Sequence, residues 1–599
     1  MTIIEQILAS HSGEVVRPGE ILDVKIDVRL ARDFGGANVV NNLKNHNLRI
    51  SDPSTAWFTF DCNPTGSDQK YAANQQYCRM FARDNQIEVF DINAGIGTHL
   101  AIDKGLALPG GTLVSTDSHA NILGAIGCFG QGMGDQDIAA AWAKGSVWFK
   151  VPESVKIVFT GKRNPGVYAK DVVLHLLQQF GANSLLGFSI EISGDAVDSF
   201  SLDERITISS MATEMGAIII LFSPSEQIIS YCEKKSGKTA VSFQKTEDWE
   251  YKKIYTVDLS EIKPLCSMPG KPHDVKKVSE TGYVKIDSVF VGSCTNGRME
   301  DMRIVARILK GKKIAPGVVL KIVPSTNEVW QQCLDEGLLK IFSDAGALVG
   351  NAGCAGCAAG QVGQNGPGEV VVSTGNRNFA GKQGKGEVYL ASPATSAASA
   401  VAGHLTTPDN LPEKPSVFKP GKKQYEAAKP EIQDEESKPE ILEGRVWIIE
   451  KDNIDTDMIY HNRYLAITDL SEMGQYTFGN LQGWEDYAKK SEPGDILVVG
   501  KNFGSGSSRQ QAVGCFMSLK NQAILARSFG AIYERNAINA AFPVLIYDDL
   551  SELNLKNKDI IRINLKSGEV TSLKNGKILK VQPFSEVQMK IYKRGGLLV

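Results

Sequence analysis

The chain has 599 residues, 42% of them apolar and 22% charged, so we expect a globular protein with several domains, because single domains usually have about 100 to 150 residues. Its formal net charge of −3 gives no reason to expect a nucleic acid or an anionic membrane as a partner. No apolar run approaches the roughly 18 residues of a membrane span, and the first residues lack the basic start and apolar core of a signal peptide, so we expect a cytoplasmic protein.

Roughly the first 400 residues alternate short β-rich runs with longer helical patterns. The predicted strands, each ending in a polar loop, are 112–119, 155–161, 287–294, 320–326 and 369–376, and the clearest predicted helices are 137–149 and 170–181. This alternation predicts an α/β fold with parallel sheets. Ligand sites then gather at the carboxyl ends of the strands, where the polar loops lie.

The composition changes after residue 416. Residues 417–444 are rich in Pro, Lys and Glu, which indicates a solvated linker, although a charged surface helix is the alternative. A strand, a glycine-rich loop and a helix follow within 494–521, which indicates a second, smaller α/β unit. We therefore expect a large part over 1–418, a linker over 419–442 and a smaller domain over 443–599.

Three of the ten cysteines lie in small-residue or strand-end loops. Cys354 and Cys357 form C-x-x-C, which alone fits a redox pair, half a zinc site or coincidence, and Cys294 lies 60 positions before Cys354. A closed structural zinc site needs four ligands, and no fourth Cys or His has finger-like spacing. An iron–sulfur cubane on three thiolates leaves one iron open, and such an iron acts as a Lewis acid toward a hydroxyl and a carboxylate. Three thiols thus point to a dehydration rather than to electron transfer.

Six motifs together resemble the aconitase and 3-isopropylmalate dehydratase family. They are STDSH, VGSCTNGRMED, NAGCAGC, STGNRNFAGKQG, NIDTDMI and NFGSGSSR, and the matches extend from Asp33 to Ala512. The resemblance implies a hydro-lyase with a three-layer α/β core, a [4Fe-4S] cluster on Cys294, Cys354 and Cys357, and a mobile C-terminal swivel domain. It leads us to expect a monomer that acts on a small hydroxy-carboxylate, with no nucleic acid and no membrane partner.

The resemblance also implies roles for further residues. Ser507 is the expected catalytic base, and the other expected catalytic residues are Asp61, His99, Asp117, His119 and Glu214. The expected substrate-binding residues are Ser118, Asn376, Arg377, Lys382, Arg463, Ser508 and Arg509. Each of these motifs also has an ordinary structural interpretation. The Asp-Ser-His triplet is compatible with a capped turn, and His99 is compatible with a core histidine whose ring nitrogens are hydrogen-bonded. The Ser-Ser-Arg stretch is compatible with a helix N-cap followed by a solvated arginine.

Several positions depart from the family pattern. Cys62 follows Asp61 where the family has histidine, which removes a group able to protonate the leaving hydroxyl. Ser210 replaces an asparagine, Lys382 an arginine, and Gln510 and Gln511 a Glu-His pair. These changes leave the predicted cluster intact but bear on substrate and activity.

Citrate and isocitrate, interconverted through cis-aconitate, are the substrates that the single-chain layout favours. Ala466 and Ile467 form an apolar loop that suits an alkyl substituent instead, so 3-isopropylmalate, methylcitrate or dimethylmalate is the alternative. Two other classes remain open: a catalytically weak cluster-based sensor or RNA-binding relative, and a zinc-thiolate structural protein.

Overall fold

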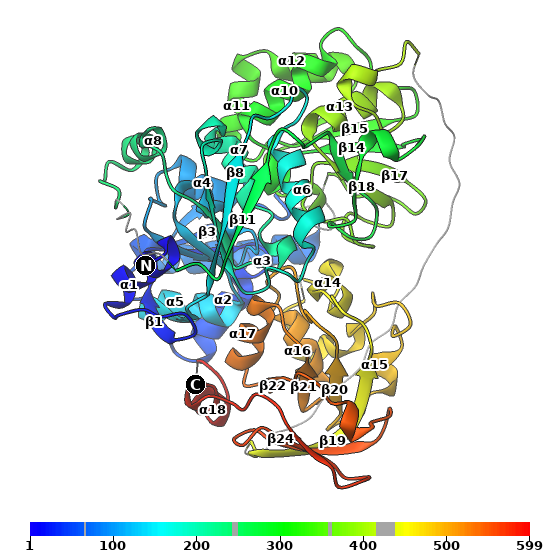
Figure 1. Cartoon of the computed structure of the whole chain (residues 1–599). Helices are drawn as coiled ribbons and strands as arrows, with labels where there is room; N and C mark the ends of the chain where they lie inside the picture. The colour runs from blue at the N-terminus through cyan, green and yellow to red at the C-terminus, as the bar shows by residue number, and fades with distance from the viewer. Residues whose placement is uncertain are drawn as a thin grey trace.

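The computed structural model describes residues 1–64, 68–241, 243, 250–357, 362–414, 438–465 and 467–598. Over these ranges the chain is a multi-domain α/β protein with five sheets, and the C-terminal unit, drawn in yellow to red, lies below the rest in Figure 1. Most of the predicted linker falls in 415–437, outside the described residues, and the first strand after it begins at Ile441.

The first sheet is fully parallel. Its strands, in spatial order, are β4 (Glu88–Phe90), β3 (Ala56–Thr59), β2 (Val28–Arg32), β5 (Thr112–Ser115) and β6 (Phe129–Gly132). The three middle strands are buried along their whole length, as expected for a sheet covered on both faces. The loops after β3, β2 and β5 therefore emerge next to one another at one edge.

Two further sheets complete the large part. The four-stranded parallel sheet has the order β10 (Ile219–Phe222), β9 (Ser189–Ser193), β8 (Ser154–Thr160) and β11 (Lys253–Asp258). The mixed seven-stranded sheet has the order β13 (Val275–Lys277), β12 (Leu265–Ser267), β18 (Glu387–Ala391), β17 (Val370–Ser373), β14 (Ser288–Val291), β15 (Val319–Ile322) and β16 (Leu348–Val349). From β18 to β16 its strands are parallel, so the loops after β17, β14 and β16 share an edge.

The C-terminal sheet is parallel on one side and antiparallel on the other. Its order is β22 (Val544–Ile546), β21 (Ala523–Ala526), β20 (Ile496–Val499), β19 (Ile441–Ile449), β23 (Ile560–Asn564), β24 (Glu569–Ser572) and β25 (Ile578–Lys580). A two-stranded antiparallel sheet joins β1 (Ile21–Lys25) to β7 (Ser146–Lys150).

Helices pack against these sheets (Figure 1). In the large part they are α1 (Ile3–Ser12), α2 (Gly36–Asn45), α3 (Gln69–Asn85), α4 (Gly97–Asp103), α5 (Asp135–Lys144), α6 (Ala169–Phe180), α7 (Leu202–Ser209), α8 (Glu226–Ser236), α9 (Ser293–Asn296), α10 (Met299–Leu309), α11 (Asn327–Asp335), α12 (Leu338–Ala345) and α13 (Pro393–Ala402). In the C-terminal unit they are α14 (Thr456–Ile459), α15 (Tyr487–Lys490), α16 (Gln511–Ser518), α17 (Ala531–Asn539) and α18 (Glu586–Lys593). None of the described helices is long and apolar enough to cross a membrane.

The C-terminal unit packs on the N-terminal region through α17. Arg535 of this helix donates a hydrogen bond from Nε to Asp137 of α5 at 2.9 Å, and its guanidinium lies 3.6 Å from the centre of the Trp148 ring. One apolar core cluster includes residues of both regions, from Ile3 to Leu598. The unit is therefore seated with its loops facing those of the large part.

The predicted strands are confirmed, and so is the helix predicted over 170–181, which is α6. The helix predicted over 137–149 is wrong over its last five residues, 145–149. The observed helix α5 ends at Lys144, its C-cap Gly145 has a left-handed φ of 83°, and the residues after it form β7 against β1. Residues 146–149 alternate between half-buried and buried, which is the two-residue period of a strand. The short apolar sequence did not distinguish this period from that of a helix.

Candidate active site

A cavity lies where the strand-end loops of the large part meet the C-terminal unit. Ten of the predicted site residues line it: Asp117, Ser118, His119, Cys294, Cys354, Cys357, Lys382, Ser507, Ser508 and Arg509. The loops after β5, β14 and β16 supply the first six of these, and the loop after β20 supplies the two serines and Arg509. The edges of three sheets therefore converge on one space, as parallel strands require.

The three predicted cluster cysteines share this cavity. Cys294 lies in α9 immediately after β14, and the turn before it needs Gly292 at φ 148° and Ser293 at φ 75°. Cys354 is held by its backbone N–H, which donates to the carbonyl of Asp61 at 2.9 Å. Burial raises the pKa of the Cys294 thiol well above its usual value, and neighbouring carboxylates and thiols add to this. A bound cationic metal centre would reverse that cost, so the donor set suits a thiolate-ligated cluster.

Arg32, at the carboxyl end of β2, is the charged centre of this side of the cavity. Its guanidinium contacts Asp61 Oδ1 at 2.7 Å, Asp117 Oδ1 at 3.0 Å and the Cys354 sulfur at 2.5 Å. Burial raises the pKa of Asp61 to about 7, although Arg32 opposes this. At Asp117 burial also acts to raise the pKa, but Arg32 and His119 outweigh burial and hold it below its usual value.

His119 and Arg377 share one carboxylate oxygen of the buried Glu214. His119 Nε2 lies 3.2 Å from Glu214 Oε1, and Arg377 Nε donates to the same oxygen at 2.6 Å. Burial lowers the pKa of His119. Burial acts to raise the pKa of Glu214, but Arg377 and His119 outweigh it, and the pKa is below its usual value. The three groups form one hydrogen-bonded network beside the cavity.

Arg377 also links the two parts of the chain. Its Nη1 donates to Ser507 Oγ of the C-terminal unit, while its buried Nη2 has no partner among the described residues. The buried Lys170 fixes the loop that carries Arg377. Its Nζ donates to the carbonyls of Thr374 at 3.1 Å and Gly375 at 2.7 Å. The arginine is thus positioned to polarise the serine hydroxyl.

Asp457 holds two cationic side chains of the cavity lining. Arg509 contacts this carboxylate through both terminal nitrogens, at 2.5 and 2.7 Å, and Lys382 Nζ lies 3.8 Å from it. Burial lowers the pKa of Lys382, although Asp457 opposes this. The Ser508 hydroxyl and Arg509 Nε are buried without a partner among the described residues, so they are available to a ligand.

Six predicted residues lie outside the cavity lining. Asn376 accepts a hydrogen bond from Cys294 Sγ at 3.3 Å, and Asp61, Glu214 and Arg377 act through the contacts given above. His99 is fully buried behind Cys294, with Nε2 at 3.0 Å from its carbonyl, and burial lowers its pKa to about 4. Arg463 is exposed, with its guanidinium over the Tyr464 ring, and the structure does not bring it to the cavity.

One wall of the cavity is apolar. Phe34, Cys62, Tyr71 and Leu465 form a buried cluster there, each at most 8% exposed. Ala466, which the sequence placed in a substrate-selecting loop, lies outside the described residues, and Ile467 packs in the core instead of lining the cavity. Leu465 instead supplies the apolar side chain in the cavity wall that the sequence analysis expected from these two residues.

The departures from the family pattern have structural partners. Asn376 Nδ2 donates to the Ser210 carbonyl at 3.2 Å, and Gln511 Nε2 donates to the Leu465 carbonyl at 3.2 Å, which fixes the apolar wall. Gln510 lies at the N-terminus of α16, and its Nε2 is 3.5 Å from the Asn536 carbonyl. The three replacements Ser210, Gln510 and Gln511 are thus neutral and hydrogen-bonded within the protein.

Arg32, Asp457 and Lys170 were not among the residues expected from the sequence. Arg32 ends an apolar strand, and Asp457 lies in the quoted NIDTDMI motif, so both had a local signal. Lys170 had none, because a lysine at the start of a helix reads as a solvated residue.

The chain matches two family models. The model of the aconitase family (aconitate hydratase) matches residues 5–403, and that of the aconitase C-terminal domain matches residues 423–549. The 3-isopropylmalate dehydratase large subunit of Acetivibrio thermocellus is 38% identical over 417 residues, which are 69% of this chain and 100% of that protein. The large subunit of Aquifex aeolicus is 37% identical over 421 residues, 69% of this chain and 98% of that protein.

Among solved structures, 3-isopropylmalate dehydratase (LeuD) of Methanocaldococcus jannaschii is 34% identical and covers 26% of this chain and 91% of its own, with a TM-score of 0.25. Aconitase X of Thermococcus kodakaraensis, in its holo-form, is 12% identical and covers 59% of this chain and 84% of its own, with a TM-score of 0.37.

Proposed function

The chain belongs to the aconitase family and is a hydro-lyase, and we propose that it uses a [4Fe-4S] cluster to dehydrate and rehydrate an alkyl-substituted hydroxy-dicarboxylate of the 3-isopropylmalate type. The arrangement that carries this proposal is one cavity lined by three cysteines and by a serine whose hydroxyl faces a buried arginine.

Cys294, Cys354 and Cys357 would hold the cluster. A cluster held there would supply Lewis-acid chemistry toward a hydroxyl leaving group, because three thiolates leave one iron without a protein ligand. Arg32 offers a positive charge to the thiolate side of this site through its contact with the Cys354 sulfur.

Ser507 is the proposed base that removes the proton from the carbon next to the hydroxyl-bearing carbon. The hydrogen bond from Arg377 stabilises the alkoxide form of this serine. His119 donates a proton to the departing hydroxyl. Its contact with Glu214 orients the imidazole ring and helps the ring to take up a proton again after that step. Ser508 Oγ, Arg509 Nε and Arg377 Nη2 are the unpartnered polar atoms that would receive the substrate carboxylates.

The sequence favoured citrate and isocitrate, and the other findings support the alternative better. The large-subunit relatives are named 3-isopropylmalate dehydratase. The cavity's three lining cations already face carboxylates of the protein: Arg32 contacts Asp61 and Asp117, while Lys382 and Arg509 face Asp457. A third substrate carboxylate against the apolar wall would lose its hydration without gaining a partner, whereas an isopropyl group loses nothing there.

The test is turnover after anaerobic reconstitution with iron and sulfide. The ultraviolet absorbance of the unsaturated acid is followed for 3-isopropylmalate, citrate, isocitrate, methylcitrate and dimethylmalate, with Ser507→Ala as the site variant and the exposed Arg562→Lys as the matched control. We expect 3-isopropylmalate or dimethylmalate to react with the control variant and not with Ser507→Ala. Preference for citrate would overturn the substrate assignment.

The same assay separates the other classes. A complete cluster with no turnover of any acid would favour the sensor or RNA-binding relative, and zinc without iron would favour the structural protein. We further propose that 1–418 binds the cluster, that 443–599 acts as the swivel domain, and that the chain works as a monomer, because Ser507 to Arg509 already reach the cavity from the same chain.

A further inference from the structure

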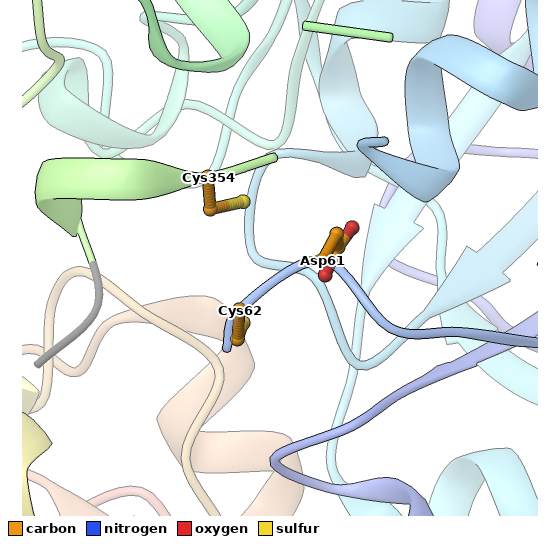
Figure 2. A group of neighbouring side chains, drawn as sticks. All are labelled: Asp61, Cys62 and Cys354. Atoms are coloured by element: carbon orange, nitrogen blue, oxygen red, sulfur yellow. The ribbon is translucent and has the colours of Figure 1, made fainter. Parts of the chain in front are cut away.

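The cavity holds a fourth thiol besides the three assigned to the cluster. Cys62 follows β3 and lines the cavity together with Cys294, Cys354 and Cys357. The sulfur atoms of Cys62 and Cys354 and a carboxylate oxygen of Asp61 all lie within 4.8 Å of one another (Figure 2). Cys62 is the position at which the family motif has a histidine, so this thiol is a property of this chain.

The backbone holds the two cysteines close together. The Cys354 N–H donates to the Asp61 carbonyl at 2.9 Å, and the Cys62 N–H donates to Asp33 Oδ1 at 3.0 Å. Gly353 has φ 156°, and a Cβ there would lie 3.0 Å from the Asp61 carbonyl oxygen. This close approach of the two backbone segments places the side chains of Cys62 and Cys354 next to each other.

The group does not suit a separate metal ion. Both carboxylate oxygens of Asp61 are engaged, Oδ1 by Arg32 Nε at 2.7 Å and Oδ2 by the Gly97 N–H at 2.8 Å. The same guanidinium donates to the Cys354 sulfur. A divalent cation would face that fixed positive charge at short range, so it is disfavoured. Two neighbouring thiols remain. Their sulfur atoms lie within 4.8 Å of each other, and a disulfide requires them to come to about 2.05 Å by side-chain rotation.

We propose that Cys62 and Cys354 form a disulfide in the cluster-free protein, and that this bond withdraws one of the three cluster thiols until it is reduced. The oxidant is a peroxide: the two thiols give up two electrons and two protons, the S–S bond forms, and hydrogen peroxide is reduced to two waters. A dithiol reverses the step by exchange. Both cysteines line the cavity, which offers a small oxidant a route to them. The proposal rests on the assignment of Cys354 to the cluster.

The first test maps the disulfide directly. Cluster-free wild-type protein, Cys62→Ser and Cys78→Ser are treated anaerobically with one equivalent of hydrogen peroxide, and the remaining thiols are blocked in denaturant. Cys78 is a suitable control because it is buried on α3 and does not line the cavity. We expect the wild-type chain to fall from ten free thiols to eight (10 − 2), with a cross-linked peptide joining Cys62 to Cys354 in mass spectra. Cys78→Ser should give the same peptide and Cys62→Ser should not.

The second readout is iron uptake without a reductant. Because a metal centre needs its thiolate ligands, the oxidised wild-type chain should bind at least about tenfold less iron than the same sample after dithiothreitol. Ten free thiols after peroxide, or a Cys354–Cys357 disulfide in place of the predicted one, overturns the proposal. If the fully reduced chain binds no iron, the proposed cluster fails, while peptide mapping still decides whether the disulfide forms.

Discussion

Replacement of Arg377 by lysine tests the link between the two parts of the chain. The guanidinium donates from Nε to Glu214 and from Nη1 to Ser507, so two acceptors are served by one planar group. Lysine keeps the charge but has a single nitrogen, and it cannot hold both acceptors in this geometry. The variant should therefore lose one hydrogen bond to a charged group, about 1.5 to 3 kcal/mol.

That loss corresponds to a fall of about 10- to 150-fold in kcat/KM, because about 1.4 kcal/mol is a factor of ten. The assay is the initial rate of formation of the unsaturated acid by Arg377→Lys, with iron content measured in the same sample. The exposed Arg562→Lys, whose partner Glu443 is also exposed, serves as control and should be unchanged.

A double variant decides whether Arg377 acts through Ser507. If it does, Arg377→Lys should cost much less in the Ser507→Ala background than in the wild-type chain. Unchanged kcat/KM in the single variant with full iron content would refute the reasoning, and equal losses in both backgrounds would show that the arginine acts elsewhere.

Three further predictions concern charge, pH and substrate shape. Arg32→Met leaves two buried carboxylates without their cation, so in the cluster-free protein it should cost about 3 to 5 kcal/mol, measured as a lowered unfolding midpoint against Arg562→Met, which should cost under about 1 kcal/mol. Burial lowers the pKa of His99 from 6.5 in the unfolded chain to about 4 in the folded chain. Above pH 6.5 the ring is therefore neutral in both the folded and the unfolded chain, whereas between pH 6.5 and 4 the unfolded chain binds a proton that the folded chain does not. Stability should thus fall as the pH drops from 6.5 towards 4, and His99→Gln should remove about 3 kcal/mol of that fall, seen as a flatter dependence of the unfolding midpoint on pH. Leu465→Ala should lower kcat/KM for 3-isopropylmalate by at least about tenfold, and an equal effect on citrate would contradict the role of the apolar wall.

Motifs that are local in the chain determined much of the site. Cys294, His119 and Ser507 each follow an apolar strand predicted from the sequence, and Cys354 lies in a loop of small residues, so these patterns are visible without any knowledge of the neighbouring strands. Parallel sheets bring such loops to one edge, so the strand pattern predicted the fold class and the edge where the site lies. The resemblance to the family supplied most of the residues that line the cavity.

The tertiary structure decided which of these loops meet. The order of strands in a sheet is a non-local property, so the sequence did not place Arg32 between Asp61, Asp117 and Cys354. It also did not show that Cys62 approaches Cys354, because the two segments are far apart in the chain and meet through non-local contacts, among them a backbone hydrogen bond and the close approach at Gly353. Residue type and loop position set the chemistry available, and packing between distant segments set which groups act on one another.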